Sequence, residues 1–319
     1  MNIKILVCYH KKDFLFKNDV LVPIHCGRAV AKEKHKDGQI SDKDYNWLLD
    51  NMIGDDTGDN ISHLNREVNE MTAIYWVWKN YDKLGNPDYI GLCHYRRLFN
   101  FRGAKYIYNK NHIMSKSGQT TKNIAKTLKG ADFITRTPIS CDELTITNME
   151  CFQDILKLSD THCPELYKSF KWMQTNKKYF CTNMFIMSRD DFFAYCSCVF
   201  PVMFDFLKLD NRGDLFTESV KRRTNPKMLE RIDDGKIWLP RLTGYLMEYI
   251  TAFYLVHMMK TKKHKEIGIL NTEECVFSWR KIFRLKHLFS INRTAINGVV
   301  YRTICLLGFS IKIKRIKNA

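Results

Sequence analysis

Four polar side chains in a row follow a buried strand near the middle of the sequence: His94, Tyr95, Arg96 and Arg97. The residues just before them, 89–93, are strand formers with a glycine among them, which predicts a covered strand. Open α/β sheets bind ligands beyond the carboxyl ends of their strands, and guanidinium groups match the geometry of phosphate and carboxylate. Segment 88–99 therefore predicts a site for an anionic ligand. The alternative is a strand that runs into a solvated basic loop.

A second chemically rich stretch, residues 53–62, holds the carboxylates Asp55, Asp56 and Asp59. Two glycines and Asn60 in the same stretch predict a turn-rich loop. Clustered carboxylates can take up a proton or hold Mg²⁺ or Mn²⁺, so the loop is a candidate part of an active site. The alternative is an ordinary surface turn in which Ser62 caps the following helix.

A third carboxylate, Glu70, lies on what the sequence predicts to be an apolar helix face. Residues 63–81 have the strongest helical period of the chain, and at about 100° per residue the apolar side chains share one broad arc that includes Glu70. A carboxylate on such a face must be paired, hydrogen-bonded or neutral. We expect Glu70 to brace the His94–Arg97 cluster, although it could instead anchor a buried arginine.

The elements that position these groups alternate along the chain. Strands are predicted at residues 3–9, 21–24, 88–93, 131–135, 180–188 (with Asn183 inside) and 267–270. Helices are predicted at residues 63–81, 121–129, 149–158, 164–176, 190–206 and 241–259, and residues 32–47 are predicted to be loop. This alternation is typical of a mostly parallel sheet covered on both faces by helices.

Composition points to an intracellular globular protein with an anionic partner. The net charge is +17, and most of it lies in segment 260–319, where fourteen Lys and Arg face three acidic residues, a balance of +11. Eleven cysteines without a zinc spacing, several of them inside predicted strands, suit a reducing cytoplasm. The start of the sequence lacks the pattern of a secretory signal, and no uninterrupted apolar run is long enough to predict a membrane-spanning helix.

The basic C-terminal segment, residues 276–319, alternates cations with apolar side chains. Trp279, Phe283, Leu288 and Phe289 are interleaved with Arg280, Lys281, Arg284 and Lys286. That spacing allows an amphipathic helix lying on anionic lipid. Two alternatives are a basic helix packed on the domain and a tail that binds nucleic acid; the concentration of the charge in the tail and the lack of a nucleic-acid motif speak against the latter.

Several of these stretches resemble one bacterial protein family. The resemblance is carried by residues 56–62, Asn65, and residues 70–80, 89–97, 183–187 and 241–248. The family was first catalogued as a domain of unknown function (DUF4422-type). Its members occur in capsular polysaccharide, exopolysaccharide and O-antigen clusters and are treated as glycosyltransferases. The resemblance covers roughly residues 1–275.

The resemblance implies a glycosyltransferase A-type fold, Rossmann-like, for residues 1–275. It implies a hexosyltransferase-like enzyme whose donor is a nucleotide sugar, most often a UDP-sugar. The acceptor would be a lipid-linked glycan, so the protein would be cytoplasmic and peripheral to the inner face of the plasma membrane. Alternatives from other classes are a nucleic-acid-binding protein that uses the tail and a non-catalytic scaffold of the polysaccharide assembly complex.

The sequence departs from most A-type glycosyltransferases at the expected metal motif. The matching strand ends in His94-Tyr95-Arg96 where an Asp-x-Asp would hold a divalent metal on the diphosphate. Fixed cations can neutralise a leaving diphosphate in place of a metal. A metal-free site is therefore favoured, with Asp55, Asp56 and Asp59 as the ligands of Mg²⁺ or Mn²⁺ if one is bound.

The candidate residues fall into three groups. Those assigned to the nucleotide and its diphosphate are Tyr9, His10, Tyr95, Arg96 and Arg97. Those that could deprotonate the acceptor are Asp55, Asp56, Asp59 and His94. Those assigned to the sugar and acceptor pocket are Asn60, Asn65, Glu70, Asn183, Arg241 and Glu248.

Overall fold

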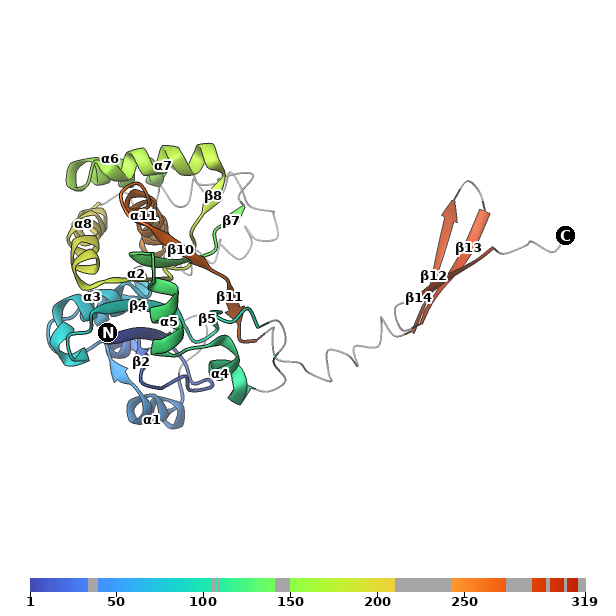
Figure 1. Cartoon of the computed structure of the whole chain (residues 1–319), viewed down its shortest axis with the longest axis horizontal. Coiled ribbons are helices and arrows are strands. Elements are labelled where there is room, and N and C mark those ends of the chain that lie inside the picture. Colours follow the sequence, from blue (N-terminus) through green and yellow to red (C-terminus); the bar gives the residue numbers. More distant parts are fainter. Residues whose placement is uncertain are drawn as a thin grey trace.

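The computed structural model describes residues 1–33, 40–104, 107, 110–140, 150–209, 242–273, 289–296, 299–306 and 309–314. Within these residues the main body is a nine-stranded sheet between two layers of helices (Figure 1). Its strands are β1 Ile3–Tyr9, β2 Leu21–His25, β3 Ile53–Gly54, β4 Tyr89–His94, β5 Arg97–Phe99, β6 Phe133–Arg136, β9 Phe185–Ser188, β10 His264–Ile267 and β11 Ile269–Asn271. The mixed α/β fold predicted from the sequence is confirmed.

The sheet is mostly parallel. Its main path runs β10-β6-β9-β4-β1-β2-β3, and only β9 is antiparallel to its neighbours on that path. The short strand β5 turns back against β4 and pairs with β11. Because β1, β2 and β4 run in the same direction, their carboxyl ends meet at one edge of the sheet.

Helices cover both faces of the sheet, as continuous apolar strands require. The helices are α1 Asp42–Asn51, α2 Asn65–Val68, α3 Met71–Lys79, α4 Ile113–Ser117, α5 Thr121–Leu128, α6 Glu150–His162, α7 Glu165–Asn176, α8 Arg189–Leu207 and α11 Leu242–Met259. Strand β1 divides its side chains between the two cores: Ile5 and Val7 pack on the α1, α4 and α5 side, and Leu6 packs on the α3, α8 and α11 side.

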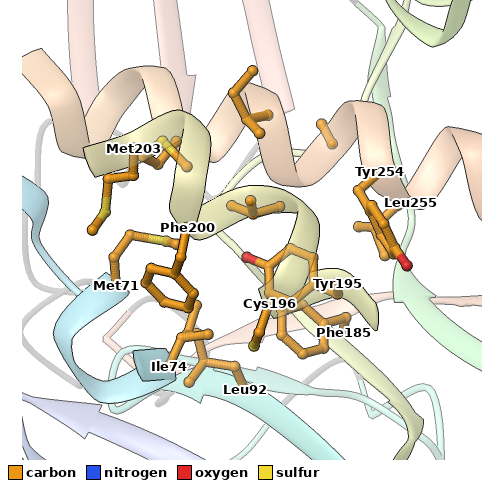
Figure 2. Close-up of a cluster of buried hydrophobic side chains, with 14 of the residues drawn as sticks. Met71, Ile74, Leu92, Phe185, Tyr195, Cys196, Phe200, Met203, Tyr254 and Leu255 are labelled. Atoms are coloured by element: carbon orange, nitrogen blue, oxygen red, sulfur yellow. The ribbon is translucent and has the colours of Figure 1, made fainter. Parts of the chain in front are cut away.

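The larger core is built around α8. Figure 2 shows Tyr195 and Phe200 of α8 between Met71 and Ile74 on one side and the α11 helix on the other. The Phe200 ring lies 5.5 Å from that of Trp78, with the two planes 4° apart. Burial of such rings is the main stabilising contribution of this layer, in which α8 packs on α3 and α11 packs on α8, α7 and α2.

Glycine is required at one position of the central strand β4. A Cβ on Gly91 would lie 2.8 Å from the Phe185 carbonyl oxygen and 2.7 Å from the Ile186 side chain. Both belong to the neighbouring strand β9, so Gly91 permits the close approach of β9 to β4.

Three local predictions were wrong in instructive ways. Residues 42–51 form α1, capped by Ser41, in part of the stretch expected to be loop. Asn183 precedes β9 in a turn instead of lying inside a strand. The expected single helix over residues 63–81 is broken at Asn69, whose φ of 52° and ψ of −134° end α2.

The break at Asn69 has a local cause. The Asn69 carbonyl accepts hydrogen bonds from Asn65 Nδ2 at 2.7 Å and from the Thr72 amide at 3.3 Å. Side-chain donors that bond nearby backbone in this way compete with the helical ladder, and Asn tolerates positive φ better than other residues. The break leaves Glu70 directly before the first residue of α3.

A second sheet comes late in the chain. Its three antiparallel strands are β12 Phe289–Ile296, β13 Val299–Leu306 and β14 Phe309–Lys314, and a small two-stranded sheet pairs β7 Ile139–Ser140 with β8 Lys178–Tyr179. The amphipathic helix expected around Trp279 lies mostly outside the described residues; from Phe289 onward the structure has strands. The predicted domain boundary at residue 275 also lies outside them. Among the described residues, no helix is long and apolar enough to cross a membrane.

Candidate functional site

A pocket of about 240 Å³ opens where the carboxyl ends of β1 and β4 meet α2, α3 and α11. It is lined by Cys8, Tyr9, His10, Cys26, Asn65, Asn69, Glu70, His94, Tyr95, Arg96, Arg97, Thr182, Tyr245 and Glu248. The whole His94–Arg97 cluster faces it, at the sheet edge where the sequence predicted a ligand. The pocket also brings together Glu70 and Glu248, which come from distant parts of the sequence.

A tight reversal of the chain places the four cluster residues side by side. Strand β4 ends at His94, β5 begins at Arg97, and these two residues pair across the turn. Thr272 holds the turn from outside, since its backbone nitrogen donates to the Arg96 carbonyl at 2.8 Å and its hydroxyl to the Tyr95 carbonyl at 3.0 Å. The segment after β11 thus fixes the site, which the sequence analysis did not foresee.

Aromatic rings form one wall of the pocket. The rings of Tyr9 and Tyr95 stack with centroids 5.1 Å apart, and His10 meets the edge of Tyr95 at 5.4 Å. The Tyr9 hydroxyl is engaged inside the protein, where it donates to the Phe14 carbonyl and accepts from the Phe16 amide, both at 2.9 Å. Tyr9 is completely buried, so its ring supports Tyr95 from behind, and the exposed His10 side chain is the more accessible part of this wall.

The two arginines of the cluster differ in their partners. Arg96 lies over the Tyr95 ring, at 5.1 Å from its centroid, and its Nε lies 3.0 Å from Glu273 Oε1. Among the described residues, Arg97 has neither a side-chain hydrogen bond nor an ion pair, and it is exposed at the pocket. An exposed guanidinium without a fixed partner is the better placed of the two to bind an anion.

The opposite wall carries two carboxylates joined by one strained turn. Thr182 and Asn183 both have positive φ, 72° and 46°. This conformation is rare for a β-branched residue such as Thr182. The Thr182 amide donates to Glu248 Oε2 at 2.9 Å, and Asn183 Nδ2 donates to Glu70 Oε1 at 2.9 Å. The turn between β8 and β9 therefore fixes one oxygen of each carboxylate.

His94 belongs to the same network. Its Nε2 lies 2.7 Å from the Thr182 carbonyl, which can only accept, so Nε2 carries the proton. The same nitrogen is 3.9 Å from Glu70 Oε1. Glu70 therefore lies beside the cluster that the sequence predicted it to brace.

Electrostatics distinguish Glu248 from an ordinary surface carboxylate. Burial and the negative charge of Glu70 raise the pKa of Glu248 from its usual 4.5 to about 7, against the lowering effects of the Thr182 amide, Arg97 and Arg136. Around neutral pH Glu248 is therefore poised between its charged and neutral forms.

Asp55 occupies a different position from the one expected of a catalytic or metal-binding residue. It is completely buried and accepts four hydrogen bonds: from the amides of Gly27 at 2.7 Å and Arg28 at 3.1 Å, and from the hydroxyls of Ser62 and Thr72 at 2.5 Å each. With both oxygens engaged, Asp55 joins β2 to α3 and is not available to a substrate or a metal.

The remaining polar residues of that loop also lie away from the pocket lining. Asp59 accepts from the Tyr75 hydroxyl at 3.2 Å, and Asn60 Oδ1 accepts from the Ser62 amide at 3.1 Å. One oxygen of Asp56 is buried without a hydrogen bond among the described residues. Ser62 does not cap a helix as expected, because its hydroxyl donates to Asp55.

The metal alternative finds no support in this geometry. Among the described residues, no three His, Cys, Asp or Glu side chains converge on a point that could hold a metal ion. Asp55, Asp56 and Asp59 in particular do not form a common donor set. Arg241, assigned to the acceptor pocket, lies outside the described residues.

Asn65 and Asn69 complete the floor of the pocket, and Tyr245 borders it one turn before Glu248 on α11. Sequence reasoning named Asn65 but missed Asn69, Thr182 and Tyr245. The position of Tyr245, one helical turn before Glu248, is a spacing that could have suggested it. Thr182 contributes through its backbone, which leaves no signal in the residue type.

Comparison with known proteins agrees with this architecture. The sequence matches the family described as "Domain of unknown function (DUF4422)" over residues 4–261. Among solved structures, the apo structure of the bifunctional glycosyltransferase WbbM is similar, with a TM-score of 0.61 and 21% sequence identity. The match covers 84% of this chain and 45% of that chain, so the chain spans less than half of WbbM. A comparison with curated proteins gave no match.

Proposed function

Since the chain belongs to the DUF4422 family, we propose that it is a glycosyltransferase that moves a sugar from a nucleotide sugar, with a UDP-sugar as the first candidate, to a glycan acceptor. The observation that carries this proposal is the pocket itself. It combines cationic and aromatic groups with two partly buried carboxylates, at the carboxyl ends of parallel strands. The fold shared with WbbM is compatible with this chemistry.

Different side chains of the pocket would contact the diphosphate, the nucleotide and the sugar. A leaving nucleoside diphosphate gains negative charge as its bond to the sugar breaks, and fixed cations lower the barrier to that step. Arg97 is exposed at the pocket, with Arg96 next to it on the turn. His10 and the edge of Tyr95, which the buried Tyr9 ring supports, would border the nucleotide. His94, Asn65, Asn69 and Glu70 would shape the space for the sugar.

We extend the proposal to the setting of the reaction. The acceptor would be a lipid-linked glycan of a capsule, exopolysaccharide or O-antigen, met at the inner face of the plasma membrane. The support is the positive charge concentrated in segment 260–319, which would attract that segment to anionic lipid. No divalent metal is assigned a role, because Arg96 and Arg97 offer the charge that a metal would supply.

The test is the release of nucleoside diphosphate from a panel of nucleotide sugars, each with and without EDTA, with membrane extract as acceptor. We expect one donor to be used and its use to survive EDTA. The Arg97→Ala variant should lose at least about tenfold in the rate of release, since a hydrogen bond to a charged group contributes about 1.5–3 kcal/mol.

Arg102→Ala is the matched control for this test. Arg102 is an exposed arginine whose side chain donates to the Ser115 carbonyl, outside the pocket. Its loss should leave the rate unchanged. Release that needs Mn²⁺ would move the diphosphate contact to a metal, and release from no donor would favour a nucleic-acid-binding protein or a non-catalytic scaffold.

A further inference from the structure

Two carboxylates facing one small pocket call for an explanation beyond binding a sugar. Glu70 and Glu248 are close enough for the charge of Glu70 to disfavour the charge of Glu248, and both line the pocket together with Arg97. Keeping two like charges in one partly buried site is unfavourable. The contacts of the two side chains differ in a way that suggests different roles.

Glu70 has the contacts of a carboxylate that is held in place. Asn183 Nδ2 donates to its Oε1 at 2.9 Å, and His94 Nε2 lies 3.9 Å from the same oxygen. Glu70 directly precedes α3, and from this position its charge acts on Glu248.

Glu248 has the contacts of a carboxylate that takes up and releases a proton. Its Oε2 is fixed by the Thr182 amide, whereas its Oε1 has no hydrogen-bond partner among the described residues. The residue lies in the middle of α11, a helix held on the sheet by a large apolar core, so its position is well defined. The groups that act on its charge are Glu70, Arg97 and Arg136, with the Tyr179 and Cys181 side chains close by.

We propose, on the basis of the proposed function, that Glu248 is the base that accepts the proton of the acceptor hydroxyl, and that Glu70 is a positioning residue whose negative charge strengthens that base. In the step, the hydroxyl oxygen forms a bond to the anomeric carbon. The bond from that carbon to the diphosphate oxygen breaks, and its electron pair leaves with the diphosphate. The hydroxyl proton passes to Glu248 Oε1 and later to solvent.

The positions of the candidate bases, as well as their electrostatics, favour Glu248. Of the candidate bases named from the sequence, Asp55 has both oxygens engaged, and Asp56 and Asp59 do not line the pocket. His94 donates its Nε2 proton to a carbonyl inside the protein. Glu248 lines the pocket, and its Oε1 accepts no hydrogen bond from the residues that the structure describes. Direct displacement by a hydroxyl that it activates would invert the configuration of the sugar.

The experiment measures two quantities on four proteins: the wild type, Glu248→Gln, Glu70→Gln and the control Glu266→Gln. The first quantity is UDP affinity by calorimetry, and the second is the rate of UDP release from the donor that the panel identifies, between pH 5 and 9. Glu266 is on β10, outside the pocket, so its variant should behave as the wild type in both.

For the wild type we expect the rate to rise with pH, with its midpoint near pH 7, where half of Glu248 is charged, and to level off at higher pH. Glu248→Gln should bind UDP with an affinity within about threefold of the wild type but release it at least 100-fold more slowly, since general-base catalysis contributes about 10²–10⁴-fold. Gln can still accept from the Thr182 amide, which preserves the local structure. Glu248→Asp should give an intermediate rate.

The Glu70→Gln variant isolates the positioning role. Removing the neighbouring negative charge lowers the proton affinity of Glu248, so the inflection of the pH profile should move at least about half a unit lower. A purely structural role would change the rate without moving the inflection.

Two results would overturn the inference while leaving the proposed function intact: a Glu248→Gln rate within about threefold of the wild type, or an inflection unmoved in Glu70→Gln. A product that keeps the donor's anomeric configuration would also overturn it. A wild type that neither binds nor releases UDP would instead overturn the proposed function, and the inference with it.

Discussion

Asp55 and Glu248 are both acidic residues near the pocket, but their surroundings give them opposite chemistry. Asp55 receives four hydrogen bonds and is sealed from solvent. Glu248 lines the pocket and receives one hydrogen bond from the described part of the chain. The number of hydrogen-bond donors around each carboxylate therefore distinguishes Asp55, which has a structural role, from Glu248, which is proposed to act on the substrate.

The structural role of Asp55 predicts a large loss of stability in Asp55→Ala. Four donors would lose their acceptor, among them two hydroxyls, and each buried unsatisfied group costs about 1–3 kcal/mol. We expect the free energy of unfolding to fall by about 3 kcal/mol or more, measured by urea denaturation. Asp50→Asn is the control, because Asp50 is exposed on α1. A loss under about 1 kcal/mol would contradict the assignment.

The raised pKa of Glu248 predicts a specific dependence of stability on pH. Between its usual pKa of 4.5 and about 7, the folded protein binds a proton on Glu248 that the unfolded chain does not. The stabilisation is therefore present at low pH and is lost as the pH rises through 7. Its size is up to about 3 kcal/mol, since one pKa unit corresponds to about 1.4 kcal/mol.

The measurement compares the wild type with Glu248→Gln at pH 5 and pH 8 by urea denaturation. The comparison is needed because His25, whose pKa burial lowers to about 3, adds a slope of opposite sign below pH 6.5 in both proteins. The stability of the wild type relative to the variant should decrease between the two pH values. A constant difference would show that Glu248 has an ordinary pKa.

At the scale of the elements, the site depends on one close contact between helices. A Cβ on Gly244 would clash with the Asn69 side chain, at the break between α2 and α3. Glycine at this position lets α11 approach the break, and Glu248 lies one turn further along the same helix. The distance between Glu248 and Glu70 is thus set by Gly244 and Asn69.

We predict that Gly244→Ala separates the two carboxylates and weakens the fold. Overpacking in a well-packed interface costs about 1–3 kcal/mol, and the rate of transfer should fall with it. Gly268→Ala is the control, since nothing lies within 4 Å of the position its Cβ would take. Differential scanning calorimetry and the UDP-release assay on both variants test this, and equal stability of the two would count against the contact.

Features of the site that depend on neighbouring residues in the sequence could be predicted, and features that depend on distant residues could not. The strands at β1 and β4 and the cluster at the end of β4 follow from local pattern, and the sequence predicted them. The break at Asn69 and the meeting of Glu70 with Glu248 depend on contacts between distant parts of the chain, which periodicity does not encode. The sequence made Asp55 a catalytic candidate because it lies in a turn-rich loop. The sequence of such a loop does not show whether the carboxylate is buried among four donors or exposed to solvent.

At the scale of the whole molecule, two features matter: the sheet edge at which the pocket opens, and the segment in which the positive charge is concentrated. The pocket opens at the carboxyl ends of β1 and β4, and most of the net charge of +17 lies in segment 260–319. An amphiphilic, basic C-terminal segment would bring a transferase to an anionic surface where a lipid-linked acceptor is found.

This view predicts binding to vesicles that contain phosphatidylglycerol. The full chain should sediment with them at low salt and be released as the ionic strength rises, because surface charge is screened. A variant in which Arg280, Lys281, Arg284 and Lys286 are replaced by Gln should bind at least about tenfold more weakly, at roughly 1 kcal/mol per basic residue near the surface. Equal sedimentation with vesicles of phosphatidylcholine alone would contradict the electrostatic account.

The central claim is that the pocket between the His94–Arg97 cluster and Glu248 is the nucleotide-sugar site. The most direct test is a crystal structure of the full chain with UDP, grown in the presence of EDTA. We predict the diphosphate within hydrogen-bond distance of the Arg97 guanidinium and the uridine against His10 and Tyr95, with Glu248 facing the side on which the sugar would extend. UDP bound outside this pocket, or a diphosphate held only by Asp55, Asp56 and Asp59, would contradict the account.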